Sequence, residues 1–372
     1  MEKNGTVMDY LRWRGDLPFT RDGFNEVDDL VLCIISYINF RRFDDLKTTD
    51  PARAVALPEV AARLTEEDEQ LGLSELDYIP LMRLAAETAR FREVRMFGFT
   101  HEYDEVKEMQ FDAVSYLLPD DTLLVSFMGT DTSLVGWKED FNMSFLTVVP
   151  AQKEAVQYLC AASDSLRGRL RVGGHSKGGN LAVYASAFCG EEIQSRIESV
   201  YNHDGPGFLS EVVTREGFQR ILGRVHTFVP QSSVVGMLLQ HEEGCAIVHS
   251  TNTWLLQHDL YSWETACNGL VFTEARTRSS RFIDSTLKAW LTQMNPEERG
   301  KLVDGVYTAL SASGAVTVAD LNRPKTAVSV LREMKKLDEP TKAIIQQAVE
   351  LLSASARENL PVVLERMRKE KE

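Results

Sequence analysis

A glycine-rich octapeptide at residues 173–180 constrains this chain more than any other segment. It reads Gly-Gly-His-Ser-Lys-Gly-Gly-Asn and lies between a short apolar run, Leu170–Val172, and a segment with helical spacing that extends to Phe188. A strand, a Gly-x-Ser-x-Gly turn and a helix in this order form a nucleophile elbow, whose strained backbone lifts the serine side chain above the sheet. Gly174 and Gly178 stand two residues either side of this serine, where a side chain would collide with the crossing helix or strand. The Gly-Lys-Ser/Thr order of a phosphate-binding loop is absent.

The elbow also predicts part of the chemistry. Ser176 would lie at the start of a helix, where backbone N–H groups lack an intrahelical partner and favour a negative charge. We expect the N–H of Lys177 to be one donor of an oxyanion hole, the set of N–H groups that stabilises a developing oxyanion. A serine alone is a weak nucleophile, so a base within about 2.6–3.2 Å is also required.

Alternating strand and helix patterns surround the elbow and predict the fold class. Strands are expected at residues 97–103, 111–118, 122–127, 170–173, 197–202, 224–229 and 245–250, and helices at 149–162, 180–188 and 211–222. This alternation predicts an α/β class, with a mostly parallel sheet flanked by helices. Together with the elbow, it predicts an α/β-hydrolase fold.

Helical segments are expected on both sides of this core. Residues 1–90 are predicted to form an N-terminal helical extension packed on the core, and residues 91–275 the α/β-hydrolase core itself. Residues 276–372 are predicted to form a C-terminal helical segment, in which Asn295, followed by Pro and Glu, marks a strong helix start. Its apolar stripes, including one at residues 280–294, are predicted to be packing faces.

Composition excludes several classes of function. The chain has 372 residues and a formal net charge of −14, without a basic stripe, so nucleic acid is not an expected partner. The most apolar run, residues 30–38, is too short to span a bilayer, and no apolar core of signal-peptide length follows Met1, which predicts a cytoplasmic protein. Five widely spaced cysteines favour reduced thiols over disulfides or a metal site. We expect no cofactor or metal, and the sequence indicates no particular oligomeric state.

The position of the base follows from chain order. In α/β-hydrolases the catalytic histidine comes after the last core strand, and the acid lies between the serine and the histidine in sequence. His258 stands in the loop after the last expected strand, so we expect it to be the base. His175 lies in the elbow itself, with its side chain directed away from the serine hydroxyl. The competing histidines precede the serine or lie in or beside strands: His101, His203, His226, His241 and His249.

Four segments, in chain order, resemble the landmarks of class 3 lipases. Phe127–Thr130, Gly136–Asp140, the elbow and His258–Trp263 stand where that family has Phe-Arg-Gly-Thr/Ser, Asp-Trp-x-x-Asp, Gly-His-Ser-Leu-Gly and His-x-x-x-x-Trp. The similarity spans about residues 90–265. With the opening segment Met8–Asp16, the chain resembles a bacterial group of lipase-like α/β-hydrolases that has no settled substrate.

The resemblance implies a role for Thr130 and draws attention to two departures. In such lipases the residue after the Phe-x-Gly turn supplies an oxyanion N–H, often with its hydroxyl helping, so Thr130 is the expected second donor. Met128 replaces the usual arginine, and Lys177 replaces the usual leucine. A charged Lys177 side chain beside the mouth of the site would favour an anionic or polar substrate over a long neutral lipid.

The acid of the site departs from the family pattern. Class 3 lipases place it at the end of the strand after residues 211–222, but here that end, Val229–Ser233, contains no carboxylate. Asp204, at the end of the preceding strand, is the expected substitute, because the tight turn that follows it could hold the carboxylate toward the histidine. Glu242 and Glu243 remain alternatives.

Together these residues predict a serine acyl-hydrolase, which is an esterase, a lipase-like enzyme or a thioesterase acting on a small-molecule ester or acyl substrate. His258 would deprotonate Ser176, and an acyl-enzyme would form. The alternative is a catalytically weak or inactive hydrolase fold kept as a binding or scaffold protein, which the unusual acid position and the large helical segments favour. We also expect one helical segment, the N-terminal rather than the C-terminal one, to roof the site and make a narrow pocket.

Overall fold

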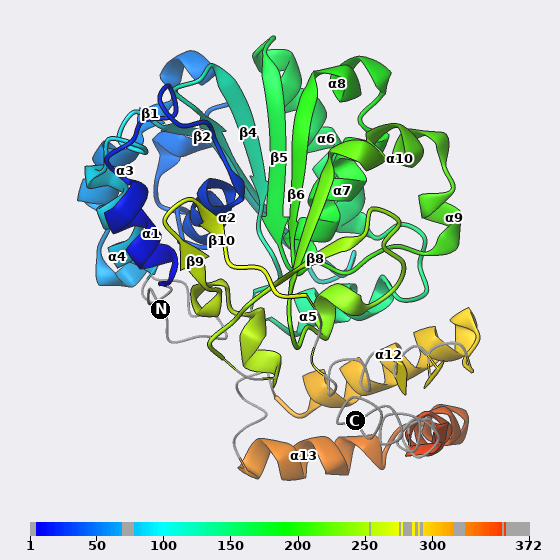
Figure 1. The fold of residues 1–372 in the computed structure, drawn as a ribbon. Coiled ribbons are helices and arrows are strands. Elements are labelled where there is room, and N and C mark those ends of the chain that lie inside the picture. Colours follow the sequence, from blue (N-terminus) through cyan, green and yellow to red (C-terminus); the bar gives the residue numbers. More distant parts are fainter. Residues whose placement is uncertain are drawn as a thin grey trace, which may run out of the picture.

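An eight-stranded sheet runs through the molecule, with its strands in sequence order from β1 to β8 (Figure 1). The strands are β1 (Val55–Ala56), β2 (Arg95–Asp104), β3 (Met109–Leu117), β4 (Thr122–Phe127), β5 (Arg169–His175), β6 (Ile197–His203), β7 (Val225–Pro230) and β8 (Cys245–Val248). Strands β1 to β4 pair antiparallel, and β4 to β8 pair parallel. The predicted α/β-hydrolase fold, with a mostly parallel sheet flanked by helices, is confirmed.

The computed structural model describes residues 5–68, 78–131, 133–252, 254–274, 277, 285–286, 289–290, 293–314, 324–351 and 353–354. Most of the apolar stripe predicted at residues 280–294 lies outside this part of the chain. Within it, no helix is both long and apolar enough to cross a bilayer. All five cysteines fall within it, and none of them forms a disulfide.

Sequential strand order decides which face of the sheet the connecting helices cover. Crossovers between neighbouring parallel strands are right-handed, so strands added one after another in the same direction place every connecting helix on the same face. These helices are α6 (Pro150–Ser165), α7 (Lys177–Phe188), α8 (Glu191–Arg196), α9 (Ser210–Val213) and α10 (Glu216–Ile221). One apolar cluster joins them to the sheet, with Leu159 and Leu181 packed against Leu123 and Val172. The opposite face of the sheet must therefore be buried by helices from another part of the chain.

The N-terminal segment (residues 1–90) supplies these helices. Its helices are α1 (Val7–Arg14), α2 (Glu26–Ile35), α3 (Leu57–Arg63) and α4 (Tyr78–Glu87), and they lie on the left side of the molecule in Figure 1. Every residue of α2 from Val27 to Ile35 is buried, the carboxylates of Asp28 and Asp29 included, so the helix is enclosed by protein on all sides. A second apolar cluster joins α2 to inward-facing strand residues such as Leu124 and Tyr201. The segment also adds β1, which the sequence did not predict, to the edge of the sheet.

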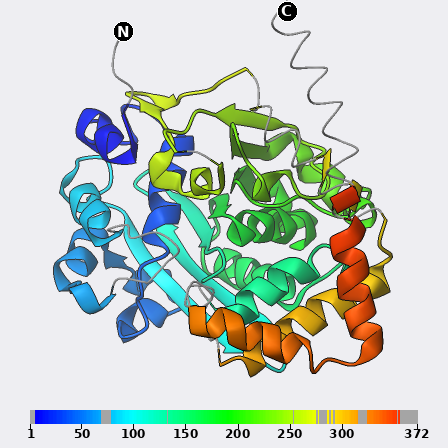
Figure 2. The same cartoon turned by 90° about the horizontal axis from the view of Figure 1, so that it is seen from below.

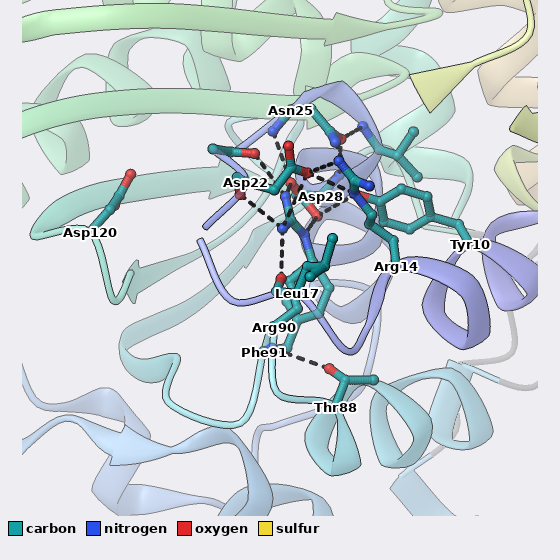
Figure 3. Close-up of polar contacts among 12 residues, drawn as sticks. Tyr10, Arg14, Leu17, Asp22, Asn25, Asp28, Thr88, Arg90, Phe91 and Asp120 are labelled. Carbon is teal, nitrogen blue, oxygen red and sulfur yellow. Dashed lines mark hydrogen bonds and ion pairs between the residues drawn. The ribbon is translucent and has the colours of Figure 1, made fainter. Parts of the chain in front are cut away.

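A buried ion pair fastens the N-terminal segment together (Figure 3). The Arg90 guanidinium donates from two nitrogens to the two Asp28 oxygens, at 2.6 and 2.5 Å, and both side chains are fully buried. Its remaining N–H groups donate to the backbone carbonyls of Leu17, Asp22 and Gly23. All five donors of the guanidinium are therefore used, which is the condition for a buried charge to be tolerated.

Helix α5 (Leu134–Asn142) and the C-terminal segment (residues 276–372) complete the described structure. The C-terminal helices α12 (Pro296–Ala312) and α13 (Pro324–Met334), with a helical stretch at 339–351, lie on a different side of the molecule from the N-terminal helices (Figure 2). Asn295 caps α12 as predicted, accepting from the Glu298 N–H at 2.9 Å. Helix α12 packs against α5.

Short elements account for the differences from the predicted pattern. The single helix expected at residues 211–222 is two short helices, α9 and α10. A two-stranded hairpin of β9 (Thr265–Ala266) and β10 (Gly269–Leu270) was not expected after β8. Seven 3-10 turns occur in the described chain: η1 (Asp44–Lys47), η2 (Pro51–Arg53), η3 (Glu66–Asp68), η4 (Leu222–Arg224), η5 (Val235–Met237), η6 (Trp254–His258) and η7 (Leu260–Ser262).

Candidate active site

The elbow has the strained geometry that its sequence predicts. Strand β5 ends at His175, helix α7 begins at Lys177, and Ser176 between them has φ 59° and ψ −129°, which non-glycine residues rarely adopt. A Cβ at Gly174 would stand 2.2 Å from the carbonyl oxygen of Gly178 in the helix, and one at Gly178 would stand 2.1 Å from the Phe127 carbonyl on β4. Both glycines are thus required by the close approach of helix and strand.

The structure brings Ser176, His258 and Asp204 together. The Nε2 atom of His258 lies 2.9 Å from Ser176 Oγ, and its Nδ1 atom lies 2.7 Å from Asp204 Oδ2. His258 ends η6, after the last strand of the sheet, and Asp204 directly follows β6. An Nδ1–H that donates to the carboxylate leaves Nε2 free to accept the serine proton, which is the arrangement of a serine-hydrolase triad.

Both carboxylate oxygens of Asp204 have hydrogen-bond partners. It is buried and has a positive φ of 52°, so the turn after β6 aims its carboxylate at His258. Its second oxygen, Oδ1, accepts from the Ser233 hydroxyl at 2.5 Å and from the Gly236 N–H at 3.2 Å. Glu243, one of the alternative acids, instead accepts from the Thr227 hydroxyl and bonds His241.

The backbone around Thr130 leaves one N–H unused. The Met128 N–H donates to the Asp112 carbonyl, the Gly129 N–H to the Tyr37 hydroxyl, and the Asp131 N–H to the Gln110 side chain. The N–H of Thr130 has no partner among the described residues. Lys177 is the first residue of α7, so its N–H also has no intrahelical acceptor. These are the two N–H groups that were predicted from the sequence to form the oxyanion hole.

Asp140 is a further residue of the site, and it was not predicted as one from the sequence. Its Oδ2 accepts from the Thr130 hydroxyl at 2.6 Å. Burial raises the pKa of Asp140 from 3.8 to about 6, although the nearby Lys177 lowers it. One sequence feature could have identified Asp140. It is the last residue of Gly136–Asp140, the segment that resembles the Asp-Trp-x-x-Asp motif of class 3 lipases.

The side chain of Lys177 does not face the mouth of the site. It is buried, and its ammonium group donates to the Gln110 carbonyl, to Gln110 Oε1 and to Glu139 Oε2 at 2.7, 2.6 and 3.1 Å. All three protons are used inside the protein, between α7, β3 and α5. The expectation that its charge would favour an anionic or polar substrate is therefore wrong.

Comparison with known protein families identifies the family of this chain. A model of the Mbeg1-like family matches residues 85–308, which is more than half of the chain. The chain belongs to the Mbeg1-like family. The matched residues include Ser176, Asp204 and His258, but most of the N-terminal segment lies outside the Mbeg1-like match.

Two further comparisons accompany this one. No curated protein matches the chain. Among solved structures, the chain is similar to a crystal structure of M37 lipase, with a TM-score of 0.39 and 13% identity over 57% of this chain and 70% of the lipase chain. A similarity at this level decides nothing about activity, so the function of this Mbeg1-like protein must be argued from its own site.

A pocket opens beside Ser176. It encloses about 440 Å³ of empty space, part of which is open to solvent, and its lining residues are Asp140, Met143, Ser144, Ser176, Lys177, Pro206, Val235, Leu238 and Leu239. Its walls come from the end of α5 and from the loop between β7 and β8. None of the described residues of the N-terminal or C-terminal segment lines it, which differs from the roof expected from the sequence. The C-terminal segment supports the wall from outside, where Arg299 donates to the Ser144 carbonyl at 2.6 Å.

One group of side chains in this Mbeg1-like chain has metal-ligand chemistry. Asp29, Cys33 and His203 lie close together and fully buried between α2 and the sheet. The His203 ring and the Cys33 thiol both bond Asp29 Oδ2, at 2.8 and 3.3 Å, and burial raises the pKa of the thiol well above its ordinary value. Because both groups share one carboxylate oxygen and the thiol keeps its proton, the contacts are those of a hydrogen-bonded seam rather than of a preformed ion site.

Proposed function

We propose that this protein is a serine acyl-hydrolase that forms an acyl-enzyme on Ser176. The proposal rests above all on the 2.9 Å contact between Ser176 Oγ and His258 Nε2, with Asp204 on the other ring nitrogen. The strained elbow supports it, and so do the N–H groups of Thr130 and Lys177, for which the described residues offer no backbone or side-chain acceptor. Membership of the Mbeg1-like family and the resemblance to class 3 lipases in the landmarks around Thr130 and Asp140 agree with it.

The reaction uses each group in turn. His258 Nε2 takes the hydroxyl proton of Ser176 as Oγ bonds to the acyl carbonyl carbon, and Asp204 stabilises the imidazolium that forms. The N–H groups of Thr130 and Lys177 hold the negative charge on the carbonyl oxygen. The bond to the leaving alcohol or thiol then breaks, and Nε2–H protonates that group. Water, deprotonated by His258, hydrolyses the acyl-enzyme and restores the serine.

The pocket indicates the size and polarity of the substrate. Its lining is mainly apolar, contributed by Met143, Pro206, Val235, Leu238 and Leu239. Because part of the roughly 440 Å³ is open solvent, the enclosed space beside Ser176 is smaller than this volume, and a short acyl or alcohol group would be better enclosed there than a long lipid chain. We therefore expect esters or thioesters with short acyl chains to be the better substrates.

A fluorophosphonate probe tests the chemistry directly, because it reacts with an activated serine inside an oxyanion hole. The wild-type protein is expected to label at one site, and Ser176→Ala to remain unlabelled while folding normally. Well-folded wild type that fails to label, under conditions that label a control esterase, would contradict the proposal. A series of p-nitrophenyl and coenzyme A esters from acetyl to palmitoyl then gives the acyl preference.

The alternative, a binding or scaffold protein on a hydrolase fold, predicts no labelling and no ester turnover. The unusual acid position counted in its favour. The 2.7 Å contact between Asp204 Oδ2 and His258 Nδ1, however, supports Asp204 as the acid of the proposed triad despite its departure from the family pattern. The geometry therefore gives the alternative no specific support.

A further inference from the structure

Tyr37, in the turn that follows α2, reaches the back of the candidate active site. Its hydroxyl oxygen lies 3.1 Å from the Gly129 nitrogen and 2.8 Å from His175 Nδ1. The other nitrogen of that ring, His175 Nε2, lies 2.8 Å from the carbonyl oxygen of His258. One tyrosine thus connects the residue before Thr130 with the backbone of the candidate base.

The donor and acceptor roles along this chain of contacts are fixed by elementary chemistry. The His258 carbonyl can only accept, so His175 Nε2 must carry a proton and donate. Burial lowers the pKa of His175 well below its ordinary value, so the ring is neutral and its Nδ1 accepts. The Tyr37 hydroxyl therefore donates to His175 and accepts from the Gly129 N–H. Hydrogen bonds aligned in one direction reinforce one another.

The Gly129 contact controls the backbone of the oxyanion loop. A Cβ at Gly129 would stand 2.2 Å from the Tyr37 hydroxyl and 3.0 Å from Ser176 Cβ, so the loop backbone is packed between the two residues. Tyr37 holds the N–H just before Thr130, and Asp140 holds the Thr130 hydroxyl. The unused Thr130 N–H lies between these two anchors.

We infer that Tyr37 is a positioning residue of the acyl-transfer site, which sets the oxyanion loop and the histidine loop relative to each other through His175. The inference rests on the proposed function. Tyr37 belongs to the N-terminal segment and lies outside the residues that match the Mbeg1-like family model. Through the contacts of Tyr37, the N-terminal segment would contribute to the site as well as to the core. Tyr37 touches no reacting atom, and it acts through Gly129 and His175.

Tyr37→Phe isolates this role, because the ring keeps its stacking on Tyr78, at 5.9 Å between centroids, and loses only the hydroxyl. We expect kcat and the rate of fluorophosphonate labelling to fall about 10- to 100-fold, less than the 10²–10³-fold typical when an oxyanion donor itself is lost. KM for a short p-nitrophenyl ester should change less than about twofold, because a misplaced donor weakens the transition state more than substrate binding.

Tyr116→Phe is the matched control. It removes the hydroxyl of a fully buried tyrosine on β3, which donates to the Leu32 carbonyl of α2 at 3.1 Å and lies 3.1 Å from Ser36 Oγ, without contacting either loop of the site. Both variants should lose similar thermal stability, but only Tyr37→Phe should lose activity. Equal activity in the two variants, or a Tyr37→Phe defect confined to KM, would overturn the inference.

Amide hydrogen exchange supplies a readout that does not depend on catalysis. The Gly129 amide should exchange faster in Tyr37→Phe than in wild type and in Tyr116→Phe, because its acceptor is gone. Unchanged exchange would overturn the inference even if wild type proves inactive toward every ester. Absence of labelling in wild type, by contrast, would contradict the proposed function and not the exchange result.

Discussion

The N-terminal segment (residues 1–90) and the C-terminal segment (residues 276–372) are both mainly helical in their described parts. They differ in how far their helices are buried. In α2 every residue from Val27 to Ile35 is buried, whereas α12 buries only Gly305 and Ala309. On α13, Val328 and Leu331 expose 59% and 61% of their surface.

Strand order explains the difference. Because β4 to β8 follow one another in sequence order, their connecting helices all cover one face, and the opposite face would be open to water without α1, α2 and α4. The N-terminal segment is therefore one of the three layers of the domain. The C-terminal segment covers no sheet face in its described part and packs on α5. A helical extension becomes part of the folded core when it buries a sheet face that the connecting helices leave open.

The largest expected effect is at the ion pair that fastens the N-terminal segment. In Arg90→Met, Asp28 loses its cation while remaining fully buried. Removing one partner of a buried pair costs about 3–5 kcal/mol, because the other charge is left uncompensated. Urea unfolding followed by circular dichroism measures the loss. A loss below about 1 kcal/mol, typical of an exposed pair, would show that this segment is held no more firmly than the C-terminal one.

A matched pair of leucines tests the same comparison through packing alone. Leu30 on α2 is fully buried, and Leu331 on α13 is 61% exposed. Leu30→Ala should lower the free energy of unfolding by about 2–5 kcal/mol through lost burial and a cavity. Leu331→Ala should change it by at most about 0.5 kcal/mol. Similar values for both would mean that the C-terminal helices have a buried interface of their own.

Local patterns in the sequence were sufficient to predict the strands of the core and the three residues of the proposed triad. The expected strands agree with β2 to β8 within a few residues, because each has its own apolar pattern and clear turn signals. The elbow is a local motif, and Asp204 and His258 were identified from their positions at strand ends in the fixed order of the fold. Each of these inferences needs only nearby residues and a known chain order.

Long-range contacts explain what sequence reasoning missed. The direction of the Lys177 side chain depends on Glu139, which approaches from α5, and the role of Tyr37 depends on Gly129, which is 92 residues away. The N-terminal segment could be recognised as helical and apolar. Its function as a layer, however, follows from strand order, which no single segment encodes. The hairpin of β9 and β10 has two residues a strand, too few for a periodic pattern.

Helix α5 lies between the core and the C-terminal segment, and Asp140 on it gives a pH test. Burial raises the pKa of this carboxyl to about 6 in the folded protein, against 3.8 ordinarily. The folded state therefore prefers the protonated form, and the stability this gives is present below pH 3.8 and is lost as pH rises through about 6. Asp140→Asn cannot titrate, so its melting temperature should rise relative to wild type between pH about 4 and about 7, by an equivalent of at most about 3 kcal/mol.

The control for this experiment is the same comparison of wild type and Asp140→Asn at a pH where the Asp140 carboxyl is protonated. At about pH 3, wild type and Asp140→Asn should unfold at similar temperatures, because the Asp140 carboxyl is then mostly protonated in the folded and the unfolded state. A constant difference between them at every pH would contradict a raised pKa at this position and would indicate a steric effect of the amide instead.

The smallest effect is expected where the C-terminal segment meets α5. Asp304 on α12 accepts from Lys138 at 2.7 Å, but it is 66% exposed, and Lys138 also bonds Glu108 at 2.7 Å. Asp304→Asn should therefore cost less than about 1 kcal/mol in urea unfolding and leave the preference among short esters unchanged. Asp28→Asn makes the same chemical change at the buried Arg90 pair and should cost several times more. If Asp304→Asn were as costly as Asp28→Asn, the C-terminal segment would belong to the core as the N-terminal segment does, since only a desolvated pair is that sensitive to the loss of one charge.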